Sequence, residues 1–287
     1  MSAPRFQHEA MATFWELTLP GAEPAYARQA AQAAFRELDR LEGELSRFIE
    51  HSVISRANRL PPGGALTLTP DVLACLLVAA EVSVATGRAF DPAFRSLRPP
   101  DLPPDLPPYF LDPATHRLTS RAERLDLDLG AVGKGYALDG LADLLREWGF
   151  TAAHLNAGGS SVLAFGDDPA AGGGWAAGLV DGEGNRVAVT LRDASLSGSG
   201  TDEQGEHLID PRTGRAAGAR PRAWALAPSA AQADALSTAF FVLEEPRIRE
   251  VCAAHPGIGA AWLAADGSLY GAGTLAGVAA AGRRTRA

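Results

Sequence analysis

The segment that most constrains the fold is residues 152–200, where short apolar stretches follow one another with glycine-rich turns between them. In order, they read "AAHLNAGG", "SSVLAFG", "WAAGLVD", "NRVAVTLRD" and "ASLSGSG". Each stretch is long enough for one short strand, and Gly, Asn and Asp supply the backbone conformations that tight turns need. This region is therefore predicted to form consecutive strands without a helix after each one.

Helices are predicted on both sides of this region. Apolar residues recur at three- and four-residue spacing from Pro24 onward, and a second helix lies between a Pro-Asp start signal and a glycine stop signal over 70–87. Further helices are expected over about 134–148, over "QADALSTAFFVL" and near 246–254, and further strands at "ATFWELTL", "RLDLDLG", "RAWALAP", "AAWLAAD" and "SLYGAG". Because there is no regular β–α alternation, the predicted fold class is α+β, a mixed architecture and not a Rossmann fold.

The proline-rich segment 98–108, "RPPDLPPDLPP", is predicted to be a semi-rigid surface loop, because proline fits neither a regular helix nor a central strand. It is too short to require a domain boundary, so residues 1–287 are predicted to form one domain with a flexible tail over 280–287. Cys75 and Cys252 stand in apolar surroundings and are predicted to be packed thiols, not parts of a disulfide framework or a metal clip.

Charge and hydropathy exclude some classes of partner. The chain has 26 basic and 34 acidic residues, a net charge of -8, and no long Lys/Arg run, which argues against a nucleic-acid-binding surface. No apolar run approaches the length of a membrane span. The N-terminal stretch has neither a basic and then apolar leader nor a lipoprotein-type cysteine. The expected location is cytoplasmic as the sequence stands, or periplasmic if an export signal was removed.

Residues 125–145, "LDLDLGAVGKGYALDGLADLL", place three glycines around Lys134 where a strand is predicted to pass into a helix. Glycines let a backbone approach a ligand closely, and the first N–H groups of a helix favour a phosphate. The spacing is not that of a Walker A motif. The alternative is a tight loop without a ligand, in which Asp128 is only a capping or turn residue.

Three other stretches have both a functional and a purely structural interpretation. Asn156 in "LNAGG" suits a turn with positive φ. In "SLSGSGTDEQGEHLIDPRTG", alternating serines precede His207, which is either an acid–base group near neutral pH or a structural histidine beside a turn. In "GRAFDPAF", Phe90 either stacks on a flat ligand or only marks the exit of a helix.

The stretch "QADALSTAF" sets a carboxylate and a hydroxyl into an otherwise apolar helix. Asp234 and Thr238 are four residues apart, so they are neighbours on one helix face. Such a pair can share one hard cation, and Mg²⁺ takes oxygen ligands, few of them from protein. The alternative is that Asp234 caps the helix and Thr238 bonds back to a carbonyl.

In combination and in this order, these stretches resemble the ApbE family, the FAD:protein FMN transferases. The similarity runs from about Met11 to Gly273 and rests most heavily on "DLGAVGKGYALDGLADLL", "HLIDPRTG" and "ADALSTA". It implies a T-fold-like α+β architecture. It also implies a Mg²⁺-dependent enzyme that attaches FMN from FAD, by a phosphoester bond, to a Thr or Ser of an acceptor protein and releases AMP.

The resemblance also implies roles by position. Mg²⁺ would be held by the side chains of Asp234 and Thr238 and by the backbone carbonyl of Ala131. His207 is the candidate acid–base group, with Asp128 as a second candidate. The residues implied in binding FAD are Met11, Phe48, Ala89, Phe90, Asp91, Lys134, Ser197, Gly198, Ser199, His207 and Ile209.

Three positions differ from the common family pattern. Ser160 stands where an Asp is common, only "TDEQGE" separates Gly200 from His207, and Phe48 replaces a frequent Tyr or Trp. Two other functions stay open: an FAD pyrophosphatase with water as the acceptor, and a non-catalytic flavin-binding or storage protein. The Asp234–Thr238 pair favours an enzyme, because a passive binder has no need of a metal pair.

Overall fold

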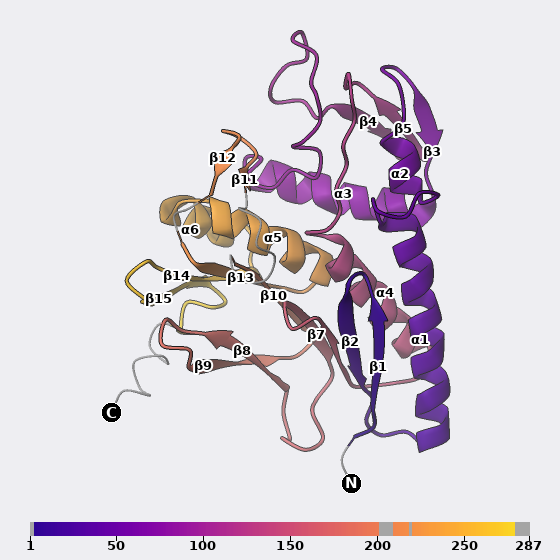
Figure 1. Cartoon of the computed structure of the whole chain (residues 1–287). Helices are drawn as coiled ribbons and strands as arrows, with labels where there is room; N and C mark the ends of the chain where they lie inside the picture. Colours follow the sequence, from indigo (N-terminus) through magenta and orange to yellow (C-terminus); the bar gives the residue numbers. More distant parts are fainter. Residues whose placement is uncertain (1–2, 201–208, 218–219, 279–287) are drawn as a thin grey trace.

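A single antiparallel sheet forms the centre of the molecule. The computed structural model describes residues 3–200, 209–217 and 220–278. All neighbouring strands of its eight-stranded sheet are antiparallel (Figure 1). Their order is β1 (Arg5–Ala10), β2 (Thr13–Thr18), β6 (Ala153–Ala157), β7 (Ser161–Phe165), β10 (Ala194–Gly200), β13 (Arg222–Ala227), β14 (Gly259–Leu263) and β15 (Leu269–Gly273). This topology confirms the predicted α+β class, because a Rossmann sheet is mostly parallel.

Helices cover one face of this sheet (Figure 1). They are α1 (Pro24–Leu45), α4 (Gly133–Glu147), α5 (Ala230–Val242) and α6 (Glu245–Ala254), and α3 (Pro70–Ala85) packs on α5 and α1. Both α1 and α3 begin with proline in the first turn, where its missing N–H costs nothing, and Glu23 and Thr69 cap them. Helix α5 packs on β10 and β13, and α4 packs on β6, β7 and α5.

Side chains of the central strands alternate between the two faces, as the period of two in a strand requires. On β10, Ser195 and Ser197 are buried on the helix side, whereas Leu196 joins a second hydrophobic cluster on the other side. On β13, Ala225 belongs to the main core and Trp224 to the second cluster. The small side chains on the helix side let α5 lie close to the sheet.

The opposite face carries a separate hairpin of β8 (Trp175–Val180) and β9 (Arg186–Leu191), which pair only with each other in the described part of the chain (Figure 1). Trp175, Leu179 and Leu191 point into the second hydrophobic cluster, together with Trp224 and Leu263 of the main sheet. The hairpin is therefore held by apolar packing and not by a continuous strand ladder.

The remaining elements lie near one end of the molecule (Figure 1). A three-stranded sheet of β3 (Ala65–Thr67), β5 (Arg117–Ser120) and β4 (Tyr109–Asp112) lies close to α2 (Val53–Ala57), and β11 (Ile209–Asp210) pairs with β12 (Arg215–Ala216). The sequence did not predict β1, β4, β5, β11, β12 or α2.

One predicted strand is wrong. Residues 124–130, "RLDLDLG", do not form a strand, although Leu125, Leu127 and Leu129 are buried as an alternating pattern demands. The backbone of this segment is bonded by side chains and by loops: Asn58 bonds Leu127 through both its amide and its carbonyl oxygen, and Ser96 Oγ accepts from Asp126. Periodicity predicts which side chains are buried, but it does not predict whether another strand lies alongside to form a β-ladder.

Smaller predictions concern the cysteines, the proline-rich segment, the tail and membrane crossing. Cys75 and Cys252 are free and buried, as predicted, and burial raises the pKa of both thiols, that of Cys252 to about 11. Residues 98–108 form turns and irregular backbone without helix or strand. The tail 280–287 lies outside the described residues. Among the described helices, none has the length and apolar character needed to cross a membrane.

Candidate active site

The site is built where α4 begins beside α5. At Gly135, in the first turn of α4, an added Cβ would lie 2.1 Å from the carbonyl oxygen of Ala230 and 2.8 Å from Cα of Ala231. No side chain other than hydrogen fits there, so glycine allows the two helix starts to touch through their backbones. The glycine-rich stretch predicted as a ligand loop thus has a packing role as well.

Each of the two helices supplies a carboxylate to the other. Asp139 of α4 accepts from the backbone N–H groups of Ala230 (2.7 Å) and Ala231 (3.0 Å) and from the hydroxyl of Ser229 (2.7 Å), which caps the start of α5. Asp234 of α5 accepts in return from the N–H of Gly135 at 3.1 Å. Burial raises the pKa of Asp139, although these hydrogen bonds oppose the shift.

Asp234 is a buried carboxylate with several donors around it, and it is only 4% exposed. Its Oδ1 accepts from the hydroxyl of Ser161 at 3.2 Å, and the ammonium Nζ of Lys134 lies 3.8 Å from the same oxygen. Lys134 Nζ also donates to the carbonyl of Gly130 at 3.2 Å. One lysine therefore joins the glycine-rich loop to the carboxylate of α5.

Thr238 lies one turn further along α5 and is half-buried. Its Oγ1 is 3.2 Å from Ser199 Oγ of β10, which also lies 2.8 Å from Ser237 Oγ. Ser237 donates to the backbone carbonyl of Asp234 at 2.8 Å, so the back-bonding considered for Thr238 is made by its neighbour instead. Ser197, two residues before Ser199, is buried with no hydrogen-bond partner for its hydroxyl among the described residues.

The donor atoms at this site fit a magnesium ion. Among the described residues, Asp234 Oδ2 accepts only the bond from Gly135, so lone pairs remain available, and Thr238 adds a hydroxyl oxygen one turn away. Within the described residues, no group of three or more His, Cys, Asp or Glu side chains could hold a metal. A site with few protein oxygens, completed by substrate phosphate and water, suits Mg²⁺ better than zinc.

Asp128 is held by arginines. Arg47 Nη1 donates to its Oδ2 at 3.1 Å, Arg95 Nη1 lies 3.9 Å away, and Asp128 Oδ1 accepts from the N–H of Gly130 at 2.9 Å. This geometry matches the capping interpretation of Asp128. Its contacts point to a structural role, that of holding the loop that contains Gly130.

The stretch 89–91 lies in the interior. Ala89 and Phe90 are 0% and 3% exposed, so the Phe90 ring packs in the core and is not presented for stacking in this structure. Asp91 is buried, forms a short ion pair with Arg88, and accepts from the N–H of Ala93 at 2.8 Å. The bond to Ala93 and the ion pair give Asp91 a structural role, and the part of this stretch in binding a ligand stays a prediction.

The other predicted ligand contacts are spread over several loops. Phe48 is 90% exposed in the loop after α1, with the Arg47 guanidinium 5.8 Å from its ring centroid. Met11 forms the β1–β2 turn with a φ of 50°. Ile209 is exposed in β11, beside Asp210, whose pKa is lowered by its ion pair with Arg212. His207, the acid–base candidate, lies outside the described residues.

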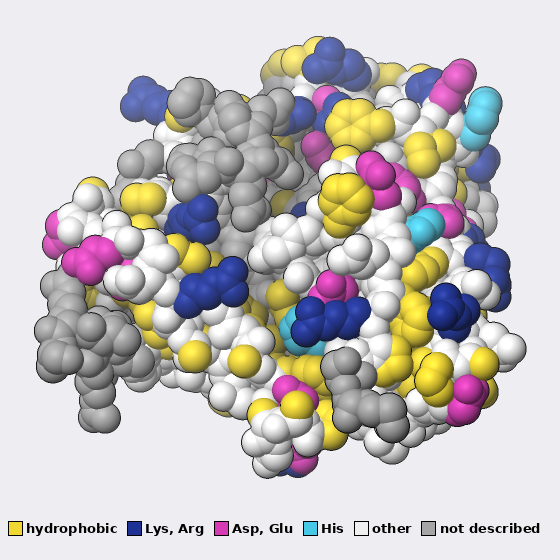
Figure 2. All heavy atoms as spheres, turned by 60° about the horizontal axis from the view of Figure 1, so that its bottom comes forward, with side chains coloured by type: hydrophobic (Ala, Val, Ile, Leu, Met, Phe, Trp, Pro, Cys, Tyr) yellow, Lys and Arg dark blue, Asp and Glu magenta, His cyan; other side chains and the backbone are white. Residues whose placement is uncertain are grey.

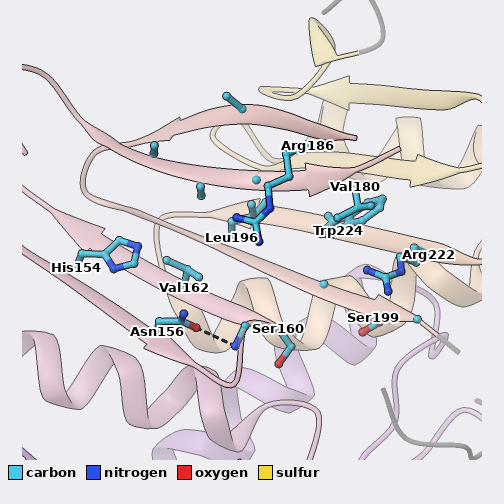
Figure 3. Close-up of a pocket in the computed structure, with 17 residues that line it drawn as sticks. His154, Asn156, Ser160, Val162, Val180, Arg186, Leu196, Ser199, Arg222 and Trp224 are labelled. Carbon is cyan, nitrogen blue, oxygen red and sulfur yellow. Dashed lines mark hydrogen bonds between the residues drawn. The ribbon is translucent and has the colours of Figure 1, made fainter. Parts of the chain in front are cut away.

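A pocket of about 450 Å³ opens on the other side of β10, between the main sheet and the β8–β9 hairpin (Figure 3). Polar groups come from His154 and Asn156 of β6, Ser160 in the β6–β7 turn, Arg186 of β9 and Arg222 of β13. Asn156 Oδ1 accepts from the N–H of Gly159, as its predicted turn role requires. Sequence reasoning missed both arginines and His154, because no local pattern connects β6, β9 and β13.

Two other residues of the site were missed by the sequence analysis. Ser161, which donates a hydrogen bond to Asp234, was not singled out from the sequence, whereas its neighbour Ser160 was. Asp139, which caps α5, carries no motif of its own. The signal for Ser161 was strand alternation: it lies two and four residues before Leu163 and Phe165, and all three are buried on the helix-facing side of β7.

The sequence model of the ApbE family matches residues 11–99 and 106–262. The FAD:protein FMN transferase of Treponema pallidum (strain Nichols) is 31% identical over 172 residues, 53% of this chain and 48% of that protein. That of Klebsiella pneumoniae (strain 342) is 31% identical over 116 residues, 36% of this chain and 34% of that protein. The matched stretches thus span about half or less of these curated relatives.

Solved structures show the same fold at lower identity. The flavinyl transferase ApbE of Pseudomonas stutzeri, in its apo form, superposes with a TM-score of 0.81 at 21% identity, covering 94% of each chain. The flavin transferase ApbE of Vibrio cholerae gives 0.78 at 22% identity, covering 94% of this chain and 97% of that one. The mixed antiparallel fold and the family match over most of the sequence agree, and the chain belongs to the ApbE family.

Proposed function

We propose that this chain is a magnesium-dependent FAD:protein FMN transferase that attaches FMN by a phosphoester bond to a Thr or Ser of an acceptor protein. The observation that carries the proposal is a pair of contacts on α5: Lys134 of α4 lies beside Asp234, and Ser199 of β10 contacts Thr238 one turn away. The names of the two curated relatives, both FAD:protein FMN transferases, support the same reaction.

The reaction replaces the phosphoanhydride bond of the FAD pyrophosphate with a phosphoester bond to the acceptor. The acceptor hydroxyl oxygen forms a bond to the phosphorus on the FMN side of the FAD pyrophosphate, and the bond from that phosphorus to the bridging oxygen breaks. AMP leaves with that oxygen, and the hydroxyl proton passes to a base, for which His207 is our candidate. Because phosphoryl transfer needs positioning and charge neutralisation more than covalent catalysis, this small set of residues is sufficient.

Several groups of this chain are placed to hold the phosphates. The N-cap of α4, Val132, makes no side-chain capping bond, and in the first turn the N–H groups of Gly133 and Gly135 bond to Leu129 and Asp234. Among the described residues this leaves the Lys134 N–H of that turn for an anion. Lys134 adds a positive charge beside that turn. A Mg²⁺ ion held by Asp234, Thr238 and the Ala131 carbonyl would neutralise charge on the pyrophosphate. The Ser161 hydroxyl and the Gly135 N–H hold the Asp234 carboxylate in orientation.

Incubation with FAD and Mg²⁺, with and without an acceptor domain, tests the proposal. Covalently flavinylated acceptor, seen by mass spectrometry, supports transfer. FMN and AMP formed equally without an acceptor would make the protein a pyrophosphatase, and unchanged FAD would make it a binding or storage protein. Removal of the metal with EDTA should stop turnover and added Mg²⁺ should restore it, so persistent activity in EDTA would contradict the metal assignment.

The Asp234→Asn variant tests the site itself. It keeps the shape of the side chain but removes the negative charge, so FMN transfer should fall by roughly 10² to 10³, as when one electrostatic group of a phosphoryl-transfer site is lost. Asp143→Asn is the matched control, because Asp143 lies on α4 with its side chain 74% exposed and pairs only with Arg146 among described residues. Equal rates in the two variants would remove Asp234 from the mechanism.

A further inference from the structure

The pocket between the main sheet and the β8–β9 hairpin lies across the sheet from most of the site already described. It shares one edge with that site, because Ser199, which contacts Thr238, also lines the pocket. From that edge the pocket extends past Arg222 and Arg186 toward His154 (Figure 3). A ligand lying in it would therefore have one end next to the proposed phosphate site.

The walls of the pocket are suited to a polypeptide backbone. Ala176, Gly178 and Ala188 line it from the exposed face of the hairpin, and Gly198 and Gly200 line it from β10. Side chains this small leave room for a main chain to approach both walls. The floor is apolar, with Leu196 and Trp224 buried at 5% and 6% exposure. The volume of about 450 Å³ lies within the usual range for ligand sites, roughly 300–1,000 Å³.

The charge of the pocket is opposite to that of the whole chain. The protein carries a net charge of -8, yet the charged residues that line the pocket, among those the structure describes, are Arg186 and Arg222, with no carboxylate. Arg186 points from β9 into the pocket toward Leu196 (Figure 3). Its side chain makes no hydrogen bond or ion pair within the described part of the chain. The space-filling view shows basic side chains (dark blue) among hydrophobic ones (yellow) on the hairpin side (Figure 2).

We infer that this pocket receives an extended segment of the acceptor protein, with a carboxylate side chain held by Arg186 and the hydroxyl to be modified at the Ser199 edge. The inference rests on the proposed transferase function, because only an acceptor needs to reach the phosphate site. Charge complementarity selects an acidic segment, and the small side chains on both walls select an extended backbone. Arg222, at the Ser199 end, orients the segment toward the site.

Peptide binding by fluorescence anisotropy tests the inference. The probes are labelled, end-blocked peptides of Ala and Gly that contain one Thr and one Asp at varied spacing, each paired with the same peptide carrying Asn. The wild-type protein should bind the best Asp peptide at least ten-fold more tightly than its Asn partner. Arg186→Glu should abolish this preference and favour a Lys peptide. Arg192→Glu, on the exposed turn after β9 where Arg192 pairs with Asp167, should leave it unchanged.

A second variant tests the shape of the pocket without changing charge. A Cβ at Gly178 would meet only the Arg186 side chain, at 3.8 Å, so Gly178→Val should fold normally while narrowing the pocket. Its affinity for the Asp peptide should fall at least ten-fold. Equal binding of Asp and Asn peptides by the wild type, no peptide binding at all, or an unchanged preference in Arg186→Glu would overturn the inference. Displacement of the peptide by AMP, with AMP affinity also lost in Arg186→Glu, would assign the pocket to a nucleotide and overturn it as well.

The proposed function can fail separately. FAD binding, followed by quenching of flavin fluorescence, should be the same in wild type, Arg186→Glu and Gly178→Val, because the pocket lies beyond the phosphate site. If the wild type binds FAD and transfers no FMN to any acceptor, the transferase assignment is wrong. The Asp-over-Asn preference then still decides whether the pocket recognises an acidic segment.

Discussion

The two faces of the central sheet are built differently. On the helix face, α5 is buried along almost its whole length, and its polar groups Asp234 and Ser237 have partners on α4, β7 and β10. On the opposite face, a two-stranded hairpin packs through a small apolar cluster and leaves a pocket with two arginines between itself and the sheet. The helix face combines the main apolar core with a network of hydrogen bonds, whereas the hairpin packs on the other face through a smaller apolar cluster.

This difference suggests a division of labour. Phosphoryl transfer requires groups held in position, and the α4–α5 contact provides them through reciprocal bonds from Asp139 and Asp234. Recognition of a partner segment tolerates a more adaptable wall, and the hairpin provides it because its outer face is exposed. Perturbing one face should therefore affect chemistry and stability together, and perturbing the other should separate them.

The largest effect is expected at the helix contact. Gly135→Ala would place a Cβ 2.1 Å from a backbone oxygen of α5, so the two helices must separate, at a cost of about 3 kcal/mol or more in the free energy of unfolding. FAD binding should be lost with it, because Asp234 loses its donor. Gly140→Ala, in the same helix, would meet only Leu41 Cδ1 at 3.7 Å and should be neutral or slightly stabilising. Chemical denaturation and FAD titration measure both effects.

The next effect is expected in the hairpin. Leu179→Ala removes a fully buried side chain from the second cluster and should lower the free energy of unfolding by about 2 kcal/mol, the low end for such a change, because a hairpin can partly close the cavity. FAD binding should remain intact. Thr190→Ala, at an exposed position of β9, serves as the control and should change little. If Leu179→Ala abolished FAD binding, the two faces would not be independent.

A smaller effect is expected from the cap of α5. Asp139→Ala removes three hydrogen bonds at the helix start and should destabilise the protein by about 1 kcal/mol. The loss is moderate because burial of Asp139 disfavours its ionised form in the folded state, which raises its pKa. The contribution of Asp139 to the free energy of unfolding therefore declines as pH rises through that raised pKa. Asp143→Ala, with an exposed side chain, is the control for thermal unfolding. No loss in Asp139→Ala would show that the cap does not stabilise α5.

The smallest effect is a pH dependence from the pocket side. Burial lowers the pKa of His154 below its ordinary 6.5, so the unfolded chain binds this proton more readily than the folded one. The contribution of neutral His154 to the free energy of unfolding should therefore be complete above pH 6.5, and it should be lost as pH falls from 6.5 through the lowered pKa. His154→Asn should flatten this part of the stability profile, and His51→Asn, at an exposed position, should not. Identical profiles in wild type and His154→Asn would contradict the assignment.

Much of the local structure was predictable from sequence because its signals are local. Most helices and central strands were predicted close to their observed bounds. The signals were the prolines at 24 and 70 that start helices, the glycines that end them, and the turns between short strands. The Asp234–Thr238 spacing correctly indicated one helix face, because residues four apart are neighbours on any helix. The segment 124–130 shows the limit: its alternation was real, but its hydrogen bonds go to Asn58 and Ser96, which no pattern within the segment reveals.

By itself, the sequence determined most of the helices and central strands, the mixed fold class and the family, since each follows from local spacing or from ordered motifs. Only the tertiary structure decided which groups meet. It placed Lys134 between Gly130 and Asp234 and buried the Phe90 ring. It also paired Asp128 with Arg47 and Arg95. It also brought Arg186 and Arg222 to one pocket from separate strands. The physical reason is that a site joins residues far apart in the chain, and only packing of the sheet between helices and hairpin sets those distances.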